Sequence, residues 1–335
     1  MATQLPPSEL GDFVEALQDD QLTEDQKLVL LISLSFQLKT AENLAKFIEI
    51  LQSKNGYKRN GNIGVKGIDI CGTGGSGLPR FNTSTLVAIL LSHAGLPIIK
   101  HGNKAASGRF GSFDLLEVLG ANIEASQESI ETAFDAHKLA FLYARKTHPL
   151  LGGLAGARTR LGIPTIFNML GPLLNPYNPQ RQFMGTAFKQ YMPLIADTAQ
   201  LLGKEHFVLV RAADGLDDIS ISTTTDVIEL KDGKQQSYQL SPSDFGIHSV
   251  SFEQLKCHNQ NENIAISKAM LAGKPTTEHY KLVAANAAFA YAKFHNKMPL
   301  ANAYLLMEDT LLSGDLAKHF DAYCETVKAT SNVKV

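Results

Sequence analysis

The sequence predicts an α/β protein, with a small N-terminal α-helical domain before a large domain whose mainly parallel central sheet is flanked by helices. From Ile68 onward, short apolar runs alternate with amphipathic segments, which is the pattern of parallel β–α–β units. Two of these apolar runs lead into glycine-rich polar loops. Because ligands bind such folds at the carboxyl ends of the strands, we expect the function to reside in these loops.

The composition is that of a globular protein, since 44% of the 335 residues are hydrophobic and 19% are charged. A net charge of −2 supplies no overall basic field for nucleic acid. Cys71, Cys257 and Cys324 do not have the spacing of a metal cage or a disulfide framework, which fits a reducing compartment. The sequence has no basic-then-apolar leader and no apolar run of transmembrane length, so we expect a cytoplasmic protein without a membrane partner.

Residues 8–53 are predicted to form three helices, because apolar residues recur there at helical spacing. Thr23 and Gln26 have the spacing of a capping box at the start of the middle helix. That helix carries more apolar surface, at residues 29–32, than a small helical bundle needs. We expect this surface to meet the main domain or a second subunit.

Strands are expected at 67–71, 97–100, 140–143, 206–211 and 226–230, and helices at 84–94, 113–119, 128–137, 188–202, 266–272, 280–294 and 299–313. Residues 158–182, here called the crossing segment, contain four prolines, which neither strands nor helix interiors accommodate. We expect it to return to the N-terminal helices before the chain re-enters the sheet. The predicted domains are therefore 1–63 completed by about 160–185, and 64–159 with 186–335.

Two loops are predicted to bind phosphate. The first combines open glycine backbone with helix-capping side chains: Gly72, Gly74, Gly75, Gly77, Asn82, Thr83, Ser84 and Thr85. The second runs from Lys100 to Asp114 and is rich in small polar residues. A single loop of this kind is more often only a tight turn, but two in neighbouring units favour a ligand with more than one phosphate. Neither loop has the glycine spacing of a dinucleotide site or a P-loop.

An acidic loop follows the expected strand at 206–211 and contains Asp214, Asp217 and Asp218. Three carboxylates so close together repel one another unless a cation or N–H groups offset their charge. Mg²⁺ is the natural counterion, since it binds through one or two carboxylates together with substrate phosphate. A solvated acidic turn is the alternative.

Together these segments resemble the anthranilate phosphoribosyltransferase family. The matching motifs occur in the family's order over about residues 65–315: Asp69 with Gly72-Thr-Gly-Gly75, Phe81-Asn-Thr-Ser-Thr85, Lys100-His-Gly-Asn103, Gly111-Ser-Phe-Asp114, 116–120, Arg158 before Leu161-Gly162, 165–176, 214–218 and Asn286-Ala-Ala. The resemblance implies transfer of phosphoribose from 5-phosphoribosyl 1-pyrophosphate (PRPP) to the amine of an aromatic amino acid, with anthranilate as the expected acceptor. It also implies Mg²⁺ as cofactor and a homodimer formed through the N-terminal helices.

The resemblance further implies the site residues. The catalytic positions are Lys100, Asn103 and Arg158, and the metal positions are Ser84, Asp217 and Asp218. The substrate-binding positions are Gly72, Thr73, Gly74, Gly75, Ser76, Arg80, Asn82, Thr83, Ser84, Thr85, Lys100, His101, Gly102, Asn103, Lys104, Ala105, Ala106, Ser107, Gly108, Ser112, His148 and Arg158. Arg158 would hold the acceptor carboxylate as a fork. His101 is either a late proton acceptor or, more commonly for a loop histidine, a hydrogen-bonding spacer.

The sequence departs from the family's usual residues at Ser76, Arg80, Gly108, Arg145, Pro164 and Asp218. Arg80 stands where the family usually has threonine, which is expected to make the phosphate site more positive. Two alternatives remain open: a paralogue with another aromatic acceptor, or a non-catalytic relative that binds nucleic acid. The latter would use a basic groove of Arg80, Lys100, Lys104, Arg109, Arg145, Lys146, Arg158 and Arg160. The near-neutral charge and the acidic pair argue against it.

Overall fold

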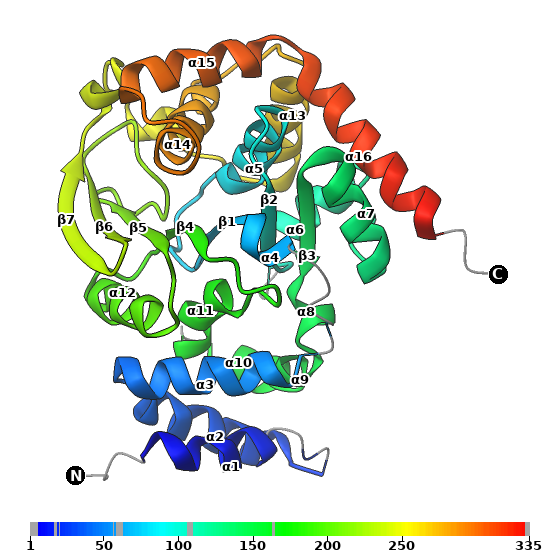
Figure 1. The fold of residues 1–335 in the computed structure, drawn as a ribbon, viewed down its shortest axis with the longest axis vertical. Coiled ribbons are helices and arrows are strands. Elements are labelled where there is room, and N and C mark those ends of the chain that lie inside the picture. The colour runs from blue at the N-terminus through cyan, green and yellow to red at the C-terminus, as the bar shows by residue number, and fades with distance from the viewer. Residues whose placement is uncertain are drawn as a thin grey trace.

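A computed structural model describes residues 6–331 of the chain except 17, 18, 20, 56, 58–62, 106–109, 163 and 164. Figure 1 shows a central sheet covered by helices, with the N-terminal helices stacked at one end of the molecule. The predicted fold class is confirmed. Ala106, Ser107, Gly108, Arg109 and Pro164 lie outside the described residues.

The sheet has seven strands in the order β3-β2-β1-β4-β5-β6-β7. Five run parallel: β1 (Ile68–Gly72), β2 (Ile98–Gly102), β3 (Leu139–Tyr143), β4 (Arg181–Gly185) and β5 (His206–Ala212). The last two, β6 (Thr225–Lys231) and β7 (Lys234–Leu240), pair antiparallel at one edge. The chain leaves β1 toward β2 on one side and later inserts β4 on the other. The switch point, where parallel sheets bind ligands, therefore lies between β1 and β4.

Two of the seven strands were not predicted. The β4 strand follows the proline-rich crossing segment directly, and its short apolar pair, Phe183 and Met184, has no periodic neighbours. The β7 strand is almost entirely polar, because it is the exposed edge strand of the sheet and needs no apolar face. Pairing with neighbouring strands makes both segments strands: β4 pairs with β1 and β5, and β7 pairs with β6.

The helices cover both faces of the sheet. They are α4 (Ile63–Lys66), α5 (Thr83–His93), α6 (Ser112–Val118), α7 (Gln127–His137), α8 (Ala144–Thr147), α9 (Pro149–Gly152), α10 (Ala155–Leu161), α11 (Ile166–Leu170), α12 (Met192–Leu201), α13 (Gln260–Leu271), α14 (His279–Phe294), α15 (Leu300–Leu312) and α16 (Asp315–Ser331). The helix expected at 188–202 is shorter, because a 3-10 turn at Lys189–Tyr191 precedes Met192. The helix expected at 266–272 begins earlier, where the Asn259 side chain caps its first turn. In the described chain, no helix is both long and apolar enough to cross a membrane.

The N-terminal helices are α1 (Leu10–Ala16), α2 (Glu24–Gln37) and α3 (Ala41–Ser53). The predicted capping box is confirmed: the Gln26 N–H donates to Thr23 Oγ1 at 3.3 Å, and the Thr23 N–H donates to Gln26 Oε1 at 2.9 Å. These groups satisfy N–H donors that a helix start otherwise leaves unpaired.

The crossing segment packs against α3, as expected. The rings of Phe47 and Phe167 meet edge to face at 6.0 Å, and Gln52 Nε2 donates to the Leu173 carbonyl at 3.1 Å. One buried apolar cluster continues from these helices through the crossing segment to α12 and to the sheet residues Met184 and Phe207. This shared core does not separate the N-terminal helices from the sheet. The division into two domains therefore stays a prediction.

Candidate functional site

The first glycine loop folds back over the end of β1. Gly74, Gly75 and Gly77 have φ values of 62°, 82° and 76°, a region that L side chains rarely adopt. The Thr73 N–H donates to the Gly185 carbonyl at 2.9 Å, so the loop stays attached to β4. These contacts leave the loop at the switch point between β1 and β4.

The acidic loop after β5 reaches across β4 to the first glycine loop. The Gly74 N–H donates to Asp217 Oδ2 at 2.9 Å. A Cβ atom on Gly185 would lie 1.6 Å from the Asp217 carbonyl oxygen, and one on Gly72 would lie 2.8 Å from Asp217 Oδ2. Gly185 was not predicted to matter. In the sequence, Gly185 appears only as a glycine that ends a short apolar run, which is a weak signal. In the structure, any side chain at position 185 would collide with the backbone of the acidic loop.

Asn286 of α14 fixes the acidic loop from the other side. Its Oδ1 accepts the Ile219 N–H at 2.8 Å, and its Nδ2 donates to the Ile219 carbonyl at 2.9 Å. Asp214 holds the loop internally, because its Oδ2 accepts the hydroxyls of Ser220 and Ser222, each at 2.5 Å. Asp214 therefore does not join the acidic pair Asp217–Asp218. Sequence reasoning found the Asn286 motif but assigned it no role.

The acidic pair is buried and carries an internal cation. Arg80 Nη1 makes an ion pair with Asp217 Oδ1 and lies 3.8 Å from Asp218 Oδ2. Burial and the neighbouring charge of Asp217 raise the pKa of Asp218 to about 7. Burial acts to lower the pKa of Arg80, but the charges of Asp217 and Asp218 outweigh it and raise that pKa. Arg80 lies against the acidic pair, and its expected role in binding phosphate stays a prediction.

The three predicted metal positions line one cavity of about 10 Å³, together with Asn286. Asp218 Oδ2 is buried there without a hydrogen-bond partner. The donors at this cavity are hard oxygen atoms, which suit Mg²⁺. Within the described residues, no group of three or more His, Cys, Asp or Glu side chains forms a complete cage. The residues therefore fit an ion that completes its coordination with water and a substrate phosphate.

Lys100 lies beneath the first loop. Its side chain is buried, and Nζ donates to the Ile70 carbonyl at 2.8 Å and to Ser84 Oγ at 3.0 Å. Burial lowers its pKa. The cation of the second strand thus reaches the first turn of α5, where it orients a predicted metal ligand.

The second loop is joined to the first. Asn82 Nδ2 donates to the Gly111 carbonyl at 3.2 Å, and Asp114 Oδ2 accepts the N–H groups of Ala105 and Gly111 at 3.0 and 2.8 Å. Lys104 pairs with Glu117 at 2.9 Å on the surface. The described parts of the second loop are therefore hydrogen-bonded to the first loop at Asn82.

His101 on β2 and His148 between α8 and α9 both contact carbonyl groups of the crossing segment. His101 Nδ1 lies 3.2 Å from the Gly171 carbonyl oxygen, and His148 Nε2 lies 2.6 Å from that of Leu174. Burial and the nearby His148 lower the pKa of His101 to about 3. Because a carbonyl only accepts, His101 Nδ1 carries the proton and the ring is neutral. This geometry favours the hydrogen-bonding spacer over the proton acceptor.

Arg158 lies in α10, which packs against α2. Its guanidinium carbon is 6.0 Å from the centre of the Phe167 ring, and burial lowers its pKa. Among the described residues it has no carboxylate partner and makes no hydrogen bond to either loop. Within the described chain, the Arg158 guanidinium contacts the Phe167 ring and has no contact with the two glycine-rich loops.

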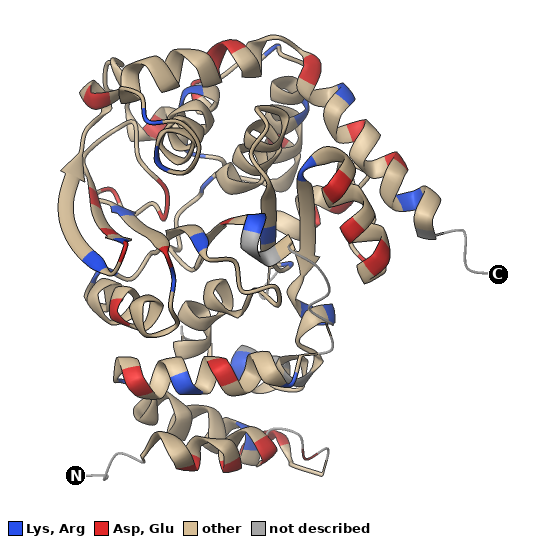
Figure 2. Cartoon of the chain, viewed as in Figure 1, with Lys and Arg blue, Asp and Glu red and all other residues tan. Residues whose placement is uncertain are grey.

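Four residues of the basic groove expected for nucleic acid have other partners or are buried. Arg80 binds the acidic pair, Lys100 is buried, and Arg160 pairs with Asp25 at 2.8 Å. Lys146 donates to the carbonyls of 124 and 125. Figure 2 shows acidic and basic residues interspersed along α3 and α16 rather than gathered by sign. The structure therefore does not favour that alternative.

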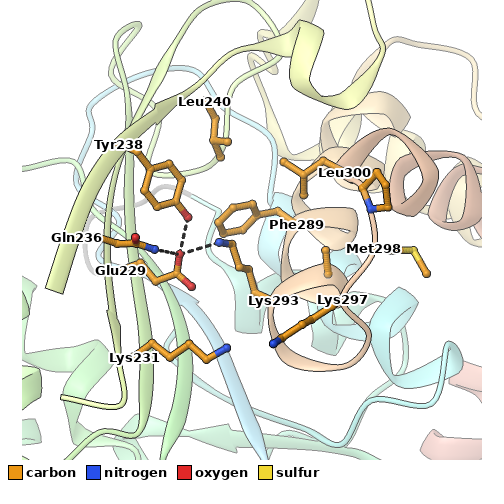
Figure 3. Close-up of a pocket in the computed structure, with 12 residues that line it drawn as sticks. Glu229, Lys231, Gln236, Tyr238, Leu240, Phe289, Lys293, Lys297, Met298 and Leu300 are labelled. Atoms are coloured by element: carbon orange, nitrogen blue, oxygen red, sulfur yellow. Dashed lines mark hydrogen bonds and ion pairs between the residues drawn. The ribbon is translucent and has the colours of Figure 1, made fainter. Parts of the chain in front are cut away.

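A separate pocket of about 550 Å³ lies between the β6–β7 edge and the α14–α15 junction (Figure 3). It shares no lining residue with the cavity at the acidic pair. Glu229 is buried in its wall and accepts from Tyr238 at 2.7 Å and from Lys293 at 2.7 Å. These contacts tie the edge of the sheet to α14.

Fold and site together define a class: an α/β protein whose strand switch point places glycine-rich loops beside a buried acidic pair, an arrangement that suits phosphate and a divalent cation. Residues 64–317 match the model of the glycosyl transferase family, a/b domain, and the chain belongs to this family.

Curated relatives and solved structures agree with this assignment. The chain is 34% identical to the anthranilate phosphoribosyltransferase of Geobacillus thermodenitrificans, over 92% of this chain and 90% of the relative. It resembles the crystal structure of the Thermus thermophilus anthranilate phosphoribosyltransferase with a TM-score of 0.83 and 28% identity, covering 97% of both chains. The Saccharomyces cerevisiae enzyme, solved in complex with PRPP and Mg, matches with a TM-score of 0.82 and 27% identity over 97% of this chain and 94% of that one.

Proposed function

We propose that the protein is a pentosyltransferase that transfers the 5-phosphoribosyl group from PRPP to the amine of anthranilate and releases pyrophosphate, a step of tryptophan biosynthesis. The observation that carries the proposal is the Gly74–Asp217 hydrogen bond, because it joins a phosphate-binding loop to a metal-binding carboxylate at the switch point. The similarity to enzymes of this name supports the choice of PRPP and anthranilate.

The chain's residues have separate tasks in this reaction. Loss of pyrophosphate from ribose C1 builds positive charge on the sugar, as in glycoside hydrolysis, so catalysis depends on stabilising the departing diphosphate. The N–H groups of the first loop and of the α5 start would hold its oxygens. Ser84, Asp217 and Asp218 would hold Mg²⁺, which when bound neutralises charge on the diphosphate. Lys100 keeps Ser84 in position through its 3.0 Å hydrogen bond.

The acceptor would bind between the second loop and α10. Arg158 offers a planar fork for its carboxylate, and Asn103 offers an amide near the end of β2. The amine attacks as a neutral nucleophile, so positioning contributes more than a strong base does. That role agrees with a neutral, fully bonded His101.

The direct test is the loss of anthranilate fluorescence when purified protein receives PRPP and Mg²⁺. We expect the loss to require both. If PRPP is consumed only with another aromatic acceptor, anthranilate is the wrong substrate. If PRPP is not consumed with any aromatic amine, the proposed reaction is wrong.

Arg158→Ala is expected to raise the KM for anthranilate about tenfold to a hundredfold, because the paired, charge-assisted hydrogen bonds to the carboxylate are lost. The affinity for PRPP should change little. Steady-state kinetics with each substrate varied in turn measures both effects. Arg160→Ala is the matched control, since Arg160 is on the same helix but pairs with Asp25. An equal loss for both substrates would remove the assigned role of Arg158.

We also propose a homodimer formed through the N-terminal helices. Val29, Ile32 and Phe36 are 64%, 39% and 59% exposed and follow helical spacing on α2. Phe36→Glu is therefore expected to shift the protein from dimer to monomer in light scattering after gel filtration, because it places a charge in an apolar interface. Val118→Glu, at an exposed apolar residue of α6, should leave the dimer intact. A wild-type monomer would contradict the proposal.

A cytoplasmic location is proposed as well. Cys71, Cys257 and Cys324 are all buried free thiols, which supports a reducing compartment.

A further inference from the structure

Arg80 is held where it can act as a permanent cation beside the acidic pair. Its backbone forms an antiparallel bridge with Lys256, and the neighbouring Pro79 carbonyl accepts the Cys257 N–H at 3.0 Å. This fixes the strand-like segment at 79–80 against a distant part of the chain. A Cβ atom on Gly74 would lie 3.7 Å from Arg80 Nη2, so the guanidinium also borders the first glycine loop.

Asp217 is consequently supplied with donors on both oxygens. Oδ1 pairs with Arg80 Nη1, and Oδ2 accepts the Gly74 N–H at 2.9 Å. Its side chain is fully buried, whereas that of Arg80 is 27% exposed. Because the site is buried and its dielectric constant is low, the guanidinium repels a second cation near Asp217 unless the guanidinium moves. Of the two partners only the Arg80 side chain reaches the solvent, so separation of the pair would move the arginine rather than Asp217.

Asp218, in contrast, has an oxygen without a hydrogen-bond donor. Its Oδ2 is buried, has no hydrogen-bond partner, and stands 3.8 Å from Arg80, too far for a hydrogen bond. Asp217 is thus held by Arg80 and Gly74, whereas Oδ2 of Asp218 is left without a hydrogen-bond partner. A divalent ion that binds both carboxylates through Asp217 Oδ1 would displace Arg80 from that oxygen.

We propose that Arg80 is a built-in counterion that competes with the divalent metal for Asp217. In the protein without substrate, the arginine neutralises the pair and keeps metal affinity low. The metal therefore enters together with the phosphate oxygens of the substrate, which supply the charge that offsets displacement of the guanidinium. The proposal rests on the proposed function only for the identity of that phosphate ligand.

The test uses Mn²⁺ alone, followed by electron paramagnetic resonance, with neither PRPP nor anthranilate present. Arg80→Gln is expected to bind Mn²⁺ about tenfold or more tightly than the wild type, because the competing charge is gone. Lys189→Gln removes an equal charge from a surface pair with Asp226 and should leave the affinity at the wild-type value. Equal affinity in the wild type and Arg80→Gln would overturn the proposal.

Two further variants locate the ion and guard against misfolding. Arg80→Gln with Asp217→Asn should lose the gain, and tight binding in this double variant would overturn the proposal, since the ion would then lie elsewhere. Arg80→Thr is a second uncharged replacement, and circular dichroism of each variant establishes that it is folded. Because no substrate is used, these results do not depend on which acceptor the enzyme takes.

Discussion

Gly185→Ala is expected to lower kcat/KM about a hundredfold, because a displacement of roughly 1 Å in a catalytic group costs that much. The added Cβ would lie 1.6 Å from the Asp217 carbonyl oxygen, and backbone cannot rotate away as a side chain can. The acidic loop must therefore lift from the end of β4 and carry both carboxylates away from the first glycine loop. Kinetics at varied PRPP and Mg²⁺ would show the loss.

The control for this variant is Gly11→Ala. A Cβ on Gly11, in α1, meets nothing within 4 Å, so the substitution should leave kcat/KM unchanged. Thermal unfolding of Gly185→Ala separates the two effects, since overpacking of this kind costs about 1–3 kcal/mol of stability. Full activity in Gly185→Ala would mean that the position of Asp217 does not govern catalysis.

Glu229→Ala is expected to reduce the free energy of unfolding by about 3–5 kcal/mol, because it removes one partner of a buried ion pair. The Glu229 side chain is 3% exposed, and Figure 3 shows Tyr238, Gln236 and Lys293 converging on it. His206 donates from the adjacent strand at 2.8 Å. Denaturant unfolding measures the loss. Glu253→Ala, in an exposed pair with Lys256, should cost far less.

The contribution of Glu229 to stability is also expected to depend on pH. Burial acts to raise the pKa of Glu229, but the hydrogen bonds from His206, Lys293 and Tyr238 outweigh it and hold the pKa well below 4.5, its ordinary value. A depressed pKa means that the stabilisation is complete above that ordinary value and is lost as the pH falls toward the folded-state pKa. The stability difference between wild type and Glu229→Ala should therefore shrink below about pH 4.5. A constant difference would show that the charge of Glu229 contributes nothing.

Much of the fold could be predicted because its signals are local. The strand expected at 67–71 is β1 (Ile68–Gly72), and the helix expected at 84–94 is α5 (Thr83–His93). These elements are specified by nearby residues: an apolar run for the strand, then a glycine turn and capping residues for the start of the helix. β4 and β7 were missed because their pairing partners, rather than their own residues, make them strands.

The site was predicted in outline but not in its contacts. Ser84, Asp217 and Asp218 do line one cavity, as sequence motifs suggested. The pairing of Arg80 with Asp217 joins residues 137 positions apart, and the bonds of Asn286 to Ile219 span 67 positions. The clearance over Gly185 likewise depends on how β4 and β5 pair. Such relations follow from sheet register, which no single stretch of sequence specifies.

In the proposed reaction, the first glycine loop and the acidic pair together hold a magnesium-bridged diphosphate. Calorimetric titration of PRPP into the protein tests it most directly, with Mg²⁺, with a chelator in its place, and with Asp217→Asn. We expect clear binding in the first titration and a loss of about tenfold or more in affinity in the other two, because each removes one part of the bridge. Equal binding of PRPP in all three titrations would show that the loop and the acidic pair do not hold such a bridge.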